Sequence, residues 1–302
     1  MLTSDDLTFF AVVAGSKSLA ESARKLNVTP PAVTQRLRAI EARIGVRLVE
    51  RSHRHLGLTD EGALVAAQAQ VVSEAIERLS EALGSRRQIV SGHLRITAPH
   101  GFGRVHVAPV VAAFVHLFPA VTVTLDLSDH PGSQLIESSD IVIHIGASGR
   151  MSQIVTTLAP NRRLLTASPV YLEQAAPIET PADLARHRCL VVRENDEDVT
   201  LWRFAHPLHG PATVRIHPTM SSNDGTVVRD WTLAGLGLAV RSEWDVAGDL
   251  ASGRLRHVLP DWEAPPADVV AMLGTRHGRS ARTTAFLDKL RQSLAVAPWR
   301  QG

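Results

Sequence analysis

The sequence lacks the cysteines and apolar runs that several classes of protein require. Cys189 is its only cysteine, so the chain can form no intrachain disulfide, no C-x-x-C motif and no thiolate zinc site. No apolar stretch approaches the about 20 residues that span a bilayer. The first ten residues, MLTSDDLTFF, are acidic where an export signal would be basic. We therefore expect a cytoplasmic protein without a membrane partner, in which Cys189 is a small buried side chain.

Enzyme motifs are missing as well. The sequence has no G-x-S-x-G elbow, no H-E-x-x-H pair and no Walker loop. The G-L-G at 235–237 follows an expected helix and precedes an expected strand, which is the reverse of a dinucleotide-binding turn. His53 and His55 have no third candidate metal ligand nearby. We expect no catalytic activity, no cofactor and no metal site.

Positive charge is concentrated at the start of the chain. A length of 302 residues and a mean hydropathy of +0.02 suit two globular domains with separate cores. Residues 1–60 hold nine Lys/Arg and six Asp/Glu, a net charge of +3, whereas the whole chain carries +2 and the remainder therefore −1. This distribution is expected if the N-terminal part contacts phosphates.

Two start signals for helices follow each other within residues 18–45. Ser18 and Glu21 have the spacing of a capping box, which predicts a short first helix. Thr29 can cap a second helix, and Pro30 fits its first position because no N–H is needed there. Two short helices joined by a tight turn indicate a helix-turn-helix.

The second of these helices has two contrasting faces. At about 100° per residue, the apolar face consists of Val33, Leu37, Ile40 and Ile44. The opposite face carries Pro31, Gln35, Arg38 and Ala42, with Thr34 on the flank. An amide can pair bidentately with adenine, and hydroxyl and guanidinium groups can contact bases or phosphates. The pattern favours DNA binding, but an ordinary helical hairpin with a solvated face has the same periodicity.

Elements on either side would complete a winged domain. Before this pair, a helix is expected after Thr3 or Ser4, ending at Gly15, with the apolar stripe Leu7, Phe10, Ala11 and Ala14. After Gly45, which can close the second helix in the left-handed region, apolar residues flank the polar tip S-H-R-H as in a short hairpin. Arg51 and Arg54 of this wing would reach phosphates or a minor groove.

A long helix follows the wing, with Thr59 as its cap. Its apolar residues alternate at spacings of four and three: Val65, Ala69, Val72, Ile76, Leu79 and Leu83. Such a heptad pattern is typical of a coiled-coil contact, so we expect the helix to pair with its copy in a second subunit. Burial against its own domain is the alternative.

From His93 onwards, expected strands and helices alternate, which indicates an α/β domain with a largely parallel sheet. The expected strands are 94–98, 121–128, 140–145, 163–167, 190–193, 213–218, 237–240 and 268–273. The clearest helices are 104–117, 225–234, 244–251 and 280–294. About 210 residues suit two lobes joined by crossings near 160–166 and 264–270.

Two strand ends lead into helices through residues that could bind a small molecule. The first contains Thr97, His100, Gly101 and Phe102, and the second contains Ser222 and Asn223. In open α/β sheets, ligands bind beyond the carboxyl ends of strands and against helix N-termini. If the two ends face each other, their helix N-termini would converge on an anion such as a carboxylate. Ordinary caps and turns would give the same residues.

These runs together resemble the LysR-type transcriptional regulators along essentially the whole chain. SLAESARKLNVTPPAVTQRLRAIEARIGVRLVERSHRHLGLTDEG is similar to that family's winged helix-turn-helix. LRITAPHGFGRVHVAPVVAAFVHLFPAVTVTLDLSD, PADLARHRCLVV and LAGLGLAVRSEWDVAGDLASGRLRHVLPDW are similar to its effector domain, which resembles type 2 periplasmic binding proteins. The resemblance implies a homodimer or homotetramer, an operator in double-stranded DNA, and a small-molecule effector that alters the recruitment of RNA polymerase.

The resemblance also assigns roles by position. It implies base or backbone contacts to DNA by Thr29, Pro30, Pro31, Thr34, Gln35, Arg38, Arg51 and Arg54, and effector contacts in the cleft between the lobes. Pro30 and Gln35 stand where many members have glutamine and arginine. Gly101 stands where relatives often have serine, and His144, a further expected effector contact, where they often have arginine. These departures leave the operator and the preferred ligand charge open.

We therefore expect α/β architecture with an N-terminal winged helix-turn-helix. The DNA-binding domain would span residues 1–60, a dimerisation helix 61–90 and the effector domain 91–302. Within the effector domain, lobe I would comprise 91–162 and 268–302, and lobe II 163–267. The expected function is DNA-binding regulation by an effector, a small organic acid by the anion argument. Two alternatives remain: a cytoplasmic solute-binding protein with an N-terminal dimerisation module, which would not shift DNA, and an enzyme, which would show turnover.

Overall fold

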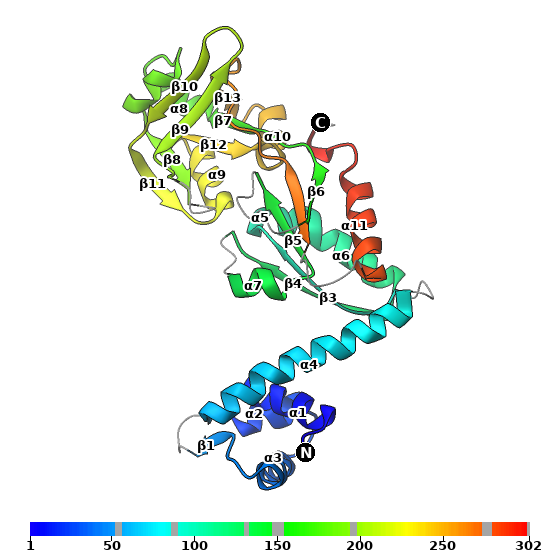
Figure 1. Ribbon diagram of the computed structural model, residues 1–302. Helices are drawn as coiled ribbons and strands as arrows, with labels where there is room; N and C mark the ends of the chain where they lie inside the picture. The colour runs from blue at the N-terminus through cyan, green and yellow to red at the C-terminus, as the bar shows by residue number, and fades with distance from the viewer. Residues whose placement is uncertain are drawn as a thin grey trace. The chain divides into compact units, whose positions relative to one another are not determined.

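The computed structural model describes residues 1–51, 56–85, 90–129, 133–146, 154–193, 198–273 and 280–300. The chain forms two compact units, residues 1–87 and 88–302 (Figure 1). Each unit has its own apolar core, as the length and composition predict.

The first unit packs three helices against a small hairpin and the start of a long helix. Its elements are α1 (Ser4–Ala14), α2 (Leu19–Lys25), α3 (Pro30–Ile44), β1 (Val49–Arg51), β2 (Leu56–Leu58) and α4 (Asp60–Ser85). β1 and β2 pair antiparallel. The buried core comprises Phe9, Phe10, Val13, Ala23, Val33, Leu37, Ile40, Leu48 and Val49. The structure therefore contains the expected three-helix arrangement followed by a short hairpin.

The helix termini follow the sequence signals with two differences. The Ser18 hydroxyl accepts from the Glu21 N–H at 3.2 Å, but the Glu21 carboxylate accepts from the N–H of Lys17 rather than that of Ser18. Thr29 is the N-cap residue of α3, yet its side chain makes no capping hydrogen bond. Gly45 ends α3 at φ +77°, in the left-handed region that glycine adopts at little cost.

The buried face of α1 differs from the expected stripe. Phe9, Phe10 and Val13 are buried, whereas Leu7, Ala11 and Ala14 are only partly covered. Helix α1 is apolar over most of its circumference, so periodicity alone does not select the face that packs. Packing against α4 and the rest of the core selects it instead.

The apolar seam of α4 is divided between two environments. Ala69 is fully buried and Val65 is partly buried against the core of the first unit, so burial in its own domain holds for this part of the seam. Further along the same face, Ile76 is 49% exposed. Leu64 and Val71 are also exposed, on a different side of the helix. Among the described helices, including α4, none is long and apolar enough to cross a membrane.

The second unit contains two five-stranded sheets. The sheet of lobe I has the order β4 (Val121–Leu127), β3 (Gly92–Ala98), β5 (Ile141–Ile145), β14 (Val269–Leu273) and β6 (Ile154–Ala159). Its helices are α5 (His100–Phe102), η1 (Gly103–Val107), α6 (Ala108–Leu117), α7 (Ser133–Ser138) and α11 (Ala281–Leu294), followed by η3 (Pro298–Arg300). The core between α6, α11 and the sheet includes Phe114 and Phe286, whose ring centroids are 5.3 Å apart.

The sheet of lobe II has the order β11 (Pro218–Ser222), β8 (Cys189–Val192), β12 (Leu238–Ser242), β7 (Arg163–Ala167) and β13 (Arg256–His257). A separate antiparallel hairpin, β9 (Leu201–His206) and β10 (Gly210–Arg215), packs near it. The helices are α8 (Pro169–Gln174), η2 (Pro181–Arg186), α9 (Gly225–Leu233) and α10 (Glu243–Ala251).

Both sheets are mixed, so the expectation of a largely parallel sheet was wrong. In lobe I, β3 pairs parallel with β4 and β5, whereas β14 pairs antiparallel with β5 and β6. In lobe II, β8 pairs parallel with β11 and β12, whereas β7 pairs antiparallel with β12 and β13. Every antiparallel pair in these two sheets includes a strand at which the chain enters or leaves that lobe. These strands are β6 and β14 in lobe I, and β7 and β13 in lobe II.

Some strands were missed, among them the mostly polar β11 and the two-residue β13. β6, β9, β11 and β13 lie outside the expected set, and the strand expected at 213–218 ends at Arg215 before β11 begins at Pro218. The helix expected from Arg104 begins earlier, at His100, and passes through the π-helical turn η1. Local pattern favours long periodic segments, which is why these boundaries escaped it.

Asn161 joins the two crossings between the sheets. β6 belongs to the sheet of lobe I and β7 to that of lobe II, so residues 160–162 form one crossing, and the segment between β13 and β14 forms the other. Asn161 is 1% exposed. Its N–H donates to Asp268 Oδ1 at 3.2 Å, and its Nδ2 donates to the Ala267 carbonyl at 2.8 Å. The two crossings are therefore hydrogen-bonded to each other.

Cys189 is fully buried in the core of lobe II, and burial raises the pKa of its thiol to about 12. Because about 10⁻⁴ of such a thiol is ionised at pH 8, we predict that Cys189 does not react with Ellman's reagent in the native protein. One thiol per chain should react in guanidinium chloride. Fast native reaction would contradict the buried position.

Candidate nucleic-acid interface and ligand cavity

Helix α3 presents a polar face that its own domain does not cover. Val33, Leu37 and Ile40 are buried, whereas Gln35 and Arg38 are exposed. The expected DNA-contacting residues Thr29, Pro30 and Pro31 are also exposed. Thr34 is half-buried, and its hydroxyl donates to the Pro30 carbonyl at 3.1 Å. The structure thus brings these expected residues together at the start and along one side of α3.

The arginines of the first unit differ in whether they have a hydrogen-bond or ion-pair partner. Arg43 pairs with Asp6 at 3.0 Å. Arg36 donates to the Asp5 carbonyl at 3.1 Å, and its guanidinium lies 4.6 Å from the centre of the Phe9 ring. Arg38, by contrast, has no hydrogen bond or ion pair to any residue that the structure describes. Its charge therefore remains available to a phosphate.

The wing is described only in part. The backbone of Arg51 pairs with Leu56 at the end of the hairpin. Arg54, His53 and His55 lie outside the described residues. The expected contacts of Arg51 and Arg54 with DNA therefore remain predictions.

A small cavity lies between the lobes of the second unit, with a volume of about 40 Å³. Lobe I contributes Pro99, Gly101, Ser128, Asp129, Ile143, His144 and Ile145. Lobe II contributes Gly225, Thr226, Arg241, Ser242 and Trp244. Two of the expected effector contacts, Gly101 and His144, therefore line it together with the first residues of α9.

Trp244 fills the space beside Gly101. A Cβ added at Gly101 would lie 2.9 Å from Cη2 of the Trp244 ring. The ring packs edge-on against Phe102 at a centroid distance of 5.4 Å. Arg104 adds a second link between the lobes, because its Nη2 donates to the Thr226 hydroxyl at 3.1 Å. A glycine at 101 thus allows the indole to close one side of the cavity.

Carboxylates of the chain itself cap the two helix N-termini that were expected to bind an anion. Asp129 Oδ1 accepts from the His100 N–H at 3.0 Å. Asp224 Oδ1 accepts from the Thr226 N–H at 2.7 Å. A ligand carboxylate would meet these negative charges at both termini. The convergence of two free N-termini on an anion is therefore not what the structure shows.

Arg241 brings a guanidinium group to the lining of the cavity. Its side chain is 7% exposed and pairs with Asp245 at 2.7 Å through Nη2, while Nε donates to the same oxygen at 3.0 Å. The guanidinium lies so close to the backbone of Gly225 that a Cβ at that position would collide with it. Nη1 has no acceptor among the described residues, so it can donate to a ligand oxygen.

The other expected effector contacts do not line the cavity. Thr97 and Phe102 are fully buried: the Thr97 hydroxyl bonds to Ser139 at 2.8 Å, and Phe102 packs in the core of lobe I. His100 contributes its N–H to Asp129. Ser222 accepts from the Asp224 N–H at 3.0 Å, and Asn223 is exposed next to it. These five residues are therefore not part of the described lining of the cavity.

Sequence reasoning missed Asp129, Thr226, Arg241 and Trp244. Asp129 and Thr226 directly adjoin a strand end and a helix start, so a wider window around those ends could have found them. Arg241 and Trp244 come from the end of β12 and the start of α10. Only the packing of the lobes brings them to the cavity.

Comparison with known proteins agrees with this architecture. Residues 4–63 match the family described as "Bacterial regulatory helix-turn-helix protein, lysR family", and residues 87–295 match "LysR substrate binding domain". The chain belongs to the LysR family of transcriptional regulators. This LysR-family protein is thus a DNA-binding transcriptional regulator with an effector domain that allows modulation by a small molecule.

Named relatives and solved structures cover nearly the whole chain. The transcriptional regulator DmlR of Escherichia coli K12 is 34% identical over 96% of this chain and 94% of its own length. The transcriptional activator TtdR of the same strain is 31% identical over 85% and 83%. Among structures, CrgA of Neisseria meningitidis has a TM-score of 0.60 with 25% identity over 97% and 99%. The Vibrio cholerae virulence activator AphB has a TM-score of 0.62, 22% identity and coverage of 96% and 98%, which supports the fold.

We predict that Gly101→Ser destabilises the second unit by about 1–3 kcal/mol, because the added atoms overpack against Trp244. Chemical denaturation monitored by tryptophan fluorescence measures this loss. Gly248→Ser is a matched control, since a Cβ at Gly248 meets no atom within 4 Å. The double variant Gly101→Ser/Trp244→Ala should lose less free energy of unfolding than the sum of the losses of the two single variants. Additive losses would show that the two residues do not interact.

Proposed function

We propose that the exposed face of α3 reads an operator in double-stranded DNA. The observation that carries this proposal is the division of α3 into a buried apolar stripe and an exposed face with Gln35 and Arg38. The Gln35 amide can pair with an adenine edge, and the Arg38 guanidinium can pair with a phosphate. The start of α3 would lie in the groove and contact the DNA through Thr29, Pro30, Pro31 and Thr34. The wing would contact the DNA through Arg51 and Arg54.

The proposed effector is a small organic acid in the cavity between the lobes. The 40 Å³ volume favours a small ligand. Because Asp129 and Asp224 already cap the neighbouring helices, Arg241 would hold the carboxylate, with Thr226 and His144 beside it. The ligand would contact both lobes and thereby shift the equilibrium between different relative positions of the two lobes.

The proposed division of labour follows the chain: residues 1–60 bind DNA, 61–90 pair subunits and 91–302 bind the effector. Apolar residues are exposed on two sides of α4, Leu64 and Val71 on one and Ile76 on the other, and they support a homodimer or homotetramer through this helix. A regulator of this kind would act on RNA polymerase in the cytoplasm, where its DNA target lies, and would have no catalytic activity. A solute-binding protein, the alternative, would leave duplex DNA unbound.

Gln35→Ala and Arg38→Ala should weaken DNA binding in different ways. Gln35→Ala should reduce affinity for the operator about 10-fold or more with little effect on unrelated duplexes, because it removes a base contact. Arg38→Ala should weaken binding to every duplex and lower the salt slope by about 1, because it removes a phosphate contact. Fluorescence anisotropy with upstream intergenic DNA at several salt concentrations measures both.

Arg186→Ala provides the control for these DNA-binding variants, because that exposed arginine lies in the other unit, where it pairs with Asp183. Its affinity and salt slope should match those of the wild type. Equal losses on all duplexes for Gln35→Ala would contradict a base-reading role. Unchanged binding by both α3 variants would contradict the proposed interface.

We predict that Val71→Asp reduces subunit association, because an aspartate in a helix-to-helix contact would be desolvated without a partner. Val71 is 51% exposed in the single chain, so folding of the first unit should be little affected. Sedimentation velocity at several concentrations measures the change in oligomer size. Leu208→Asp is the matched control, since Leu208 is 86% exposed at the tip of the β9–β10 hairpin. Identical sedimentation of wild type and Val71→Asp would exclude this side of α4 from the contact.

A further inference from the structure

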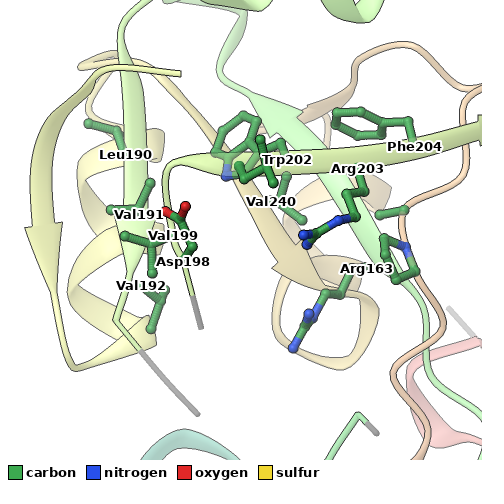
Figure 2. Close-up of a pocket in the computed structure, with 13 residues that line it drawn as sticks. Arg163, Leu190, Val191, Val192, Asp198, Val199, Trp202, Arg203, Phe204 and Val240 are labelled. Atoms are coloured by element: carbon green, nitrogen blue, oxygen red, sulfur yellow. The ribbon is translucent and has the colours of Figure 1, made fainter. Parts of the chain in front are cut away.

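A second cavity lies within lobe II, between the sheet and the β9–β10 hairpin. Its volume is about 110 Å³, larger than that of the cavity between the lobes. Figure 2 shows the residues around it, with the side chains of Trp202 and Val240 close together on one side. The two cavities have no described lining residue in common.

Most of the residues that line this lobe II cavity have apolar side chains. Val191 and Phe204 are buried, and Trp202 and Val240 are partly buried, all in the cluster that packs between the sheet and the hairpin. Val240 and Arg241 are neighbours in β12, so their side chains point to opposite faces of the sheet. Val240 therefore lines this cavity while Arg241 lines the one between the lobes. An apolar pocket wall of this kind fits a ring or a short aliphatic chain.

Positive charge gathers at one side of the cavity. The side chains of Arg163 and Arg203 lie on the same side of it (Figure 2). Arg203 is exposed and makes no hydrogen bond or ion pair with the residues that the structure describes. The guanidinium of an arginine is suited to bidentate pairing with a carboxylate.

Asp198, the one acidic residue described in the lining, is already engaged. Its Oδ1 accepts from the N–H and the hydroxyl of Thr200 at 2.9 and 2.6 Å, and its Oδ2 lies 3.8 Å from Arg215. These hydrogen bonds and the nearby arginines lower the pKa of Asp198. Arg215 is not part of the lining, so it pairs with Asp198 from outside the cavity.

We infer that the lobe II cavity is a second ligand site, which binds a small carboxylate with an apolar body. The carboxylate pairs with Arg203 beside Arg163, and the apolar body lies among the apolar side chains of the lining. A closed apolar cavity of about 150 Å³ holds benzene, so an open cavity of 110 Å³ suits a body no larger than one ring.

Isothermal titration of the full-length protein with benzoate at low salt tests the inference. We expect one benzoate per chain at millimolar concentration, and weaker binding of benzyl alcohol, which keeps the ring and lacks the charge. Arg203→Gln should raise the dissociation constant about tenfold or more. Arg188→Gln, which removes an exposed arginine of the same lobe outside the lining, should leave it unchanged. Val240→Phe, which fills the cavity, should also weaken binding, with circular dichroism confirming the fold.

Thr226→Val tells binding at the lobe II cavity apart from binding at the cavity between the lobes. Thr226 lines the cavity between the lobes and does not line the lobe II cavity. The inference requires that Thr226→Val binds benzoate as the wild type does. Loss of binding in Thr226→Val with retention in Arg203→Gln would assign benzoate to the cavity between the lobes and overturn the inference. Equal affinity for benzoate and benzyl alcohol, or no binding of benzoate by the wild type, would also overturn it.

Discussion

The buried amide of Asn161 holds together the two places where the chain passes from one sheet to the other. The backbone N–H of Asn161 donates to Asp268 Oδ1, and its side-chain Nδ2 donates to the Ala267 carbonyl in the returning segment. The side-chain Oδ1 accepts from the Trp244 N–H at 3.3 Å. A buried amide that lost these partners would pay a desolvation cost of about 1–3 kcal/mol. The hydrogen bonds of one side chain thus link both crossings to the start of α10.

A buried carboxylate reinforces the same region. Glu243 is 6% exposed and pairs with Arg162 in the first crossing and with Arg300 near the C-terminus, each at 2.7 Å. Burial opposes its ionisation, but the two guanidinium groups keep its pKa below the usual value. The next residue, Trp244, closes one side of the cavity between the lobes. The position of this cavity therefore depends on the polar contacts that join the lobes.

The first unit separates stability from recognition on a single helix. Val33, Leu37 and Ile40 bury one side of α3, so the residues proposed to contact DNA can be polar without cost to the core. Helix α4 combines two roles in a similar way. Ala69 packs in the core of the unit, while Ile76, one heptad later on the same face, is 49% exposed. A heptad pattern records both kinds of contact without distinguishing them.

Local pattern predicted much of the fold. The caps at Ser18 and Thr59, the left-handed Gly45 and the α3 stripe were identified because each depends on residues within one or two turns. The long apolar strands of both lobes were found for the same reason. The strands β11 and β13 escaped because the first is mostly polar and the second has only two residues.

The sequence by itself determined the helix-turn-helix, the two-unit organisation and the family to which the chain belongs. Tertiary structure alone decided which face of α1 is buried, that both sheets are mixed, and that Trp244 and Arg241 line the cavity between the lobes. It also showed that Asp129 accepts from the N–H of His100, 29 residues away, at a helix start expected to bind an anion. The physical reason is distance along the chain: most caps and periodic faces are local, whereas a cavity between lobes depends on contacts such as that of Arg104 with Thr226, which are 122 residues apart.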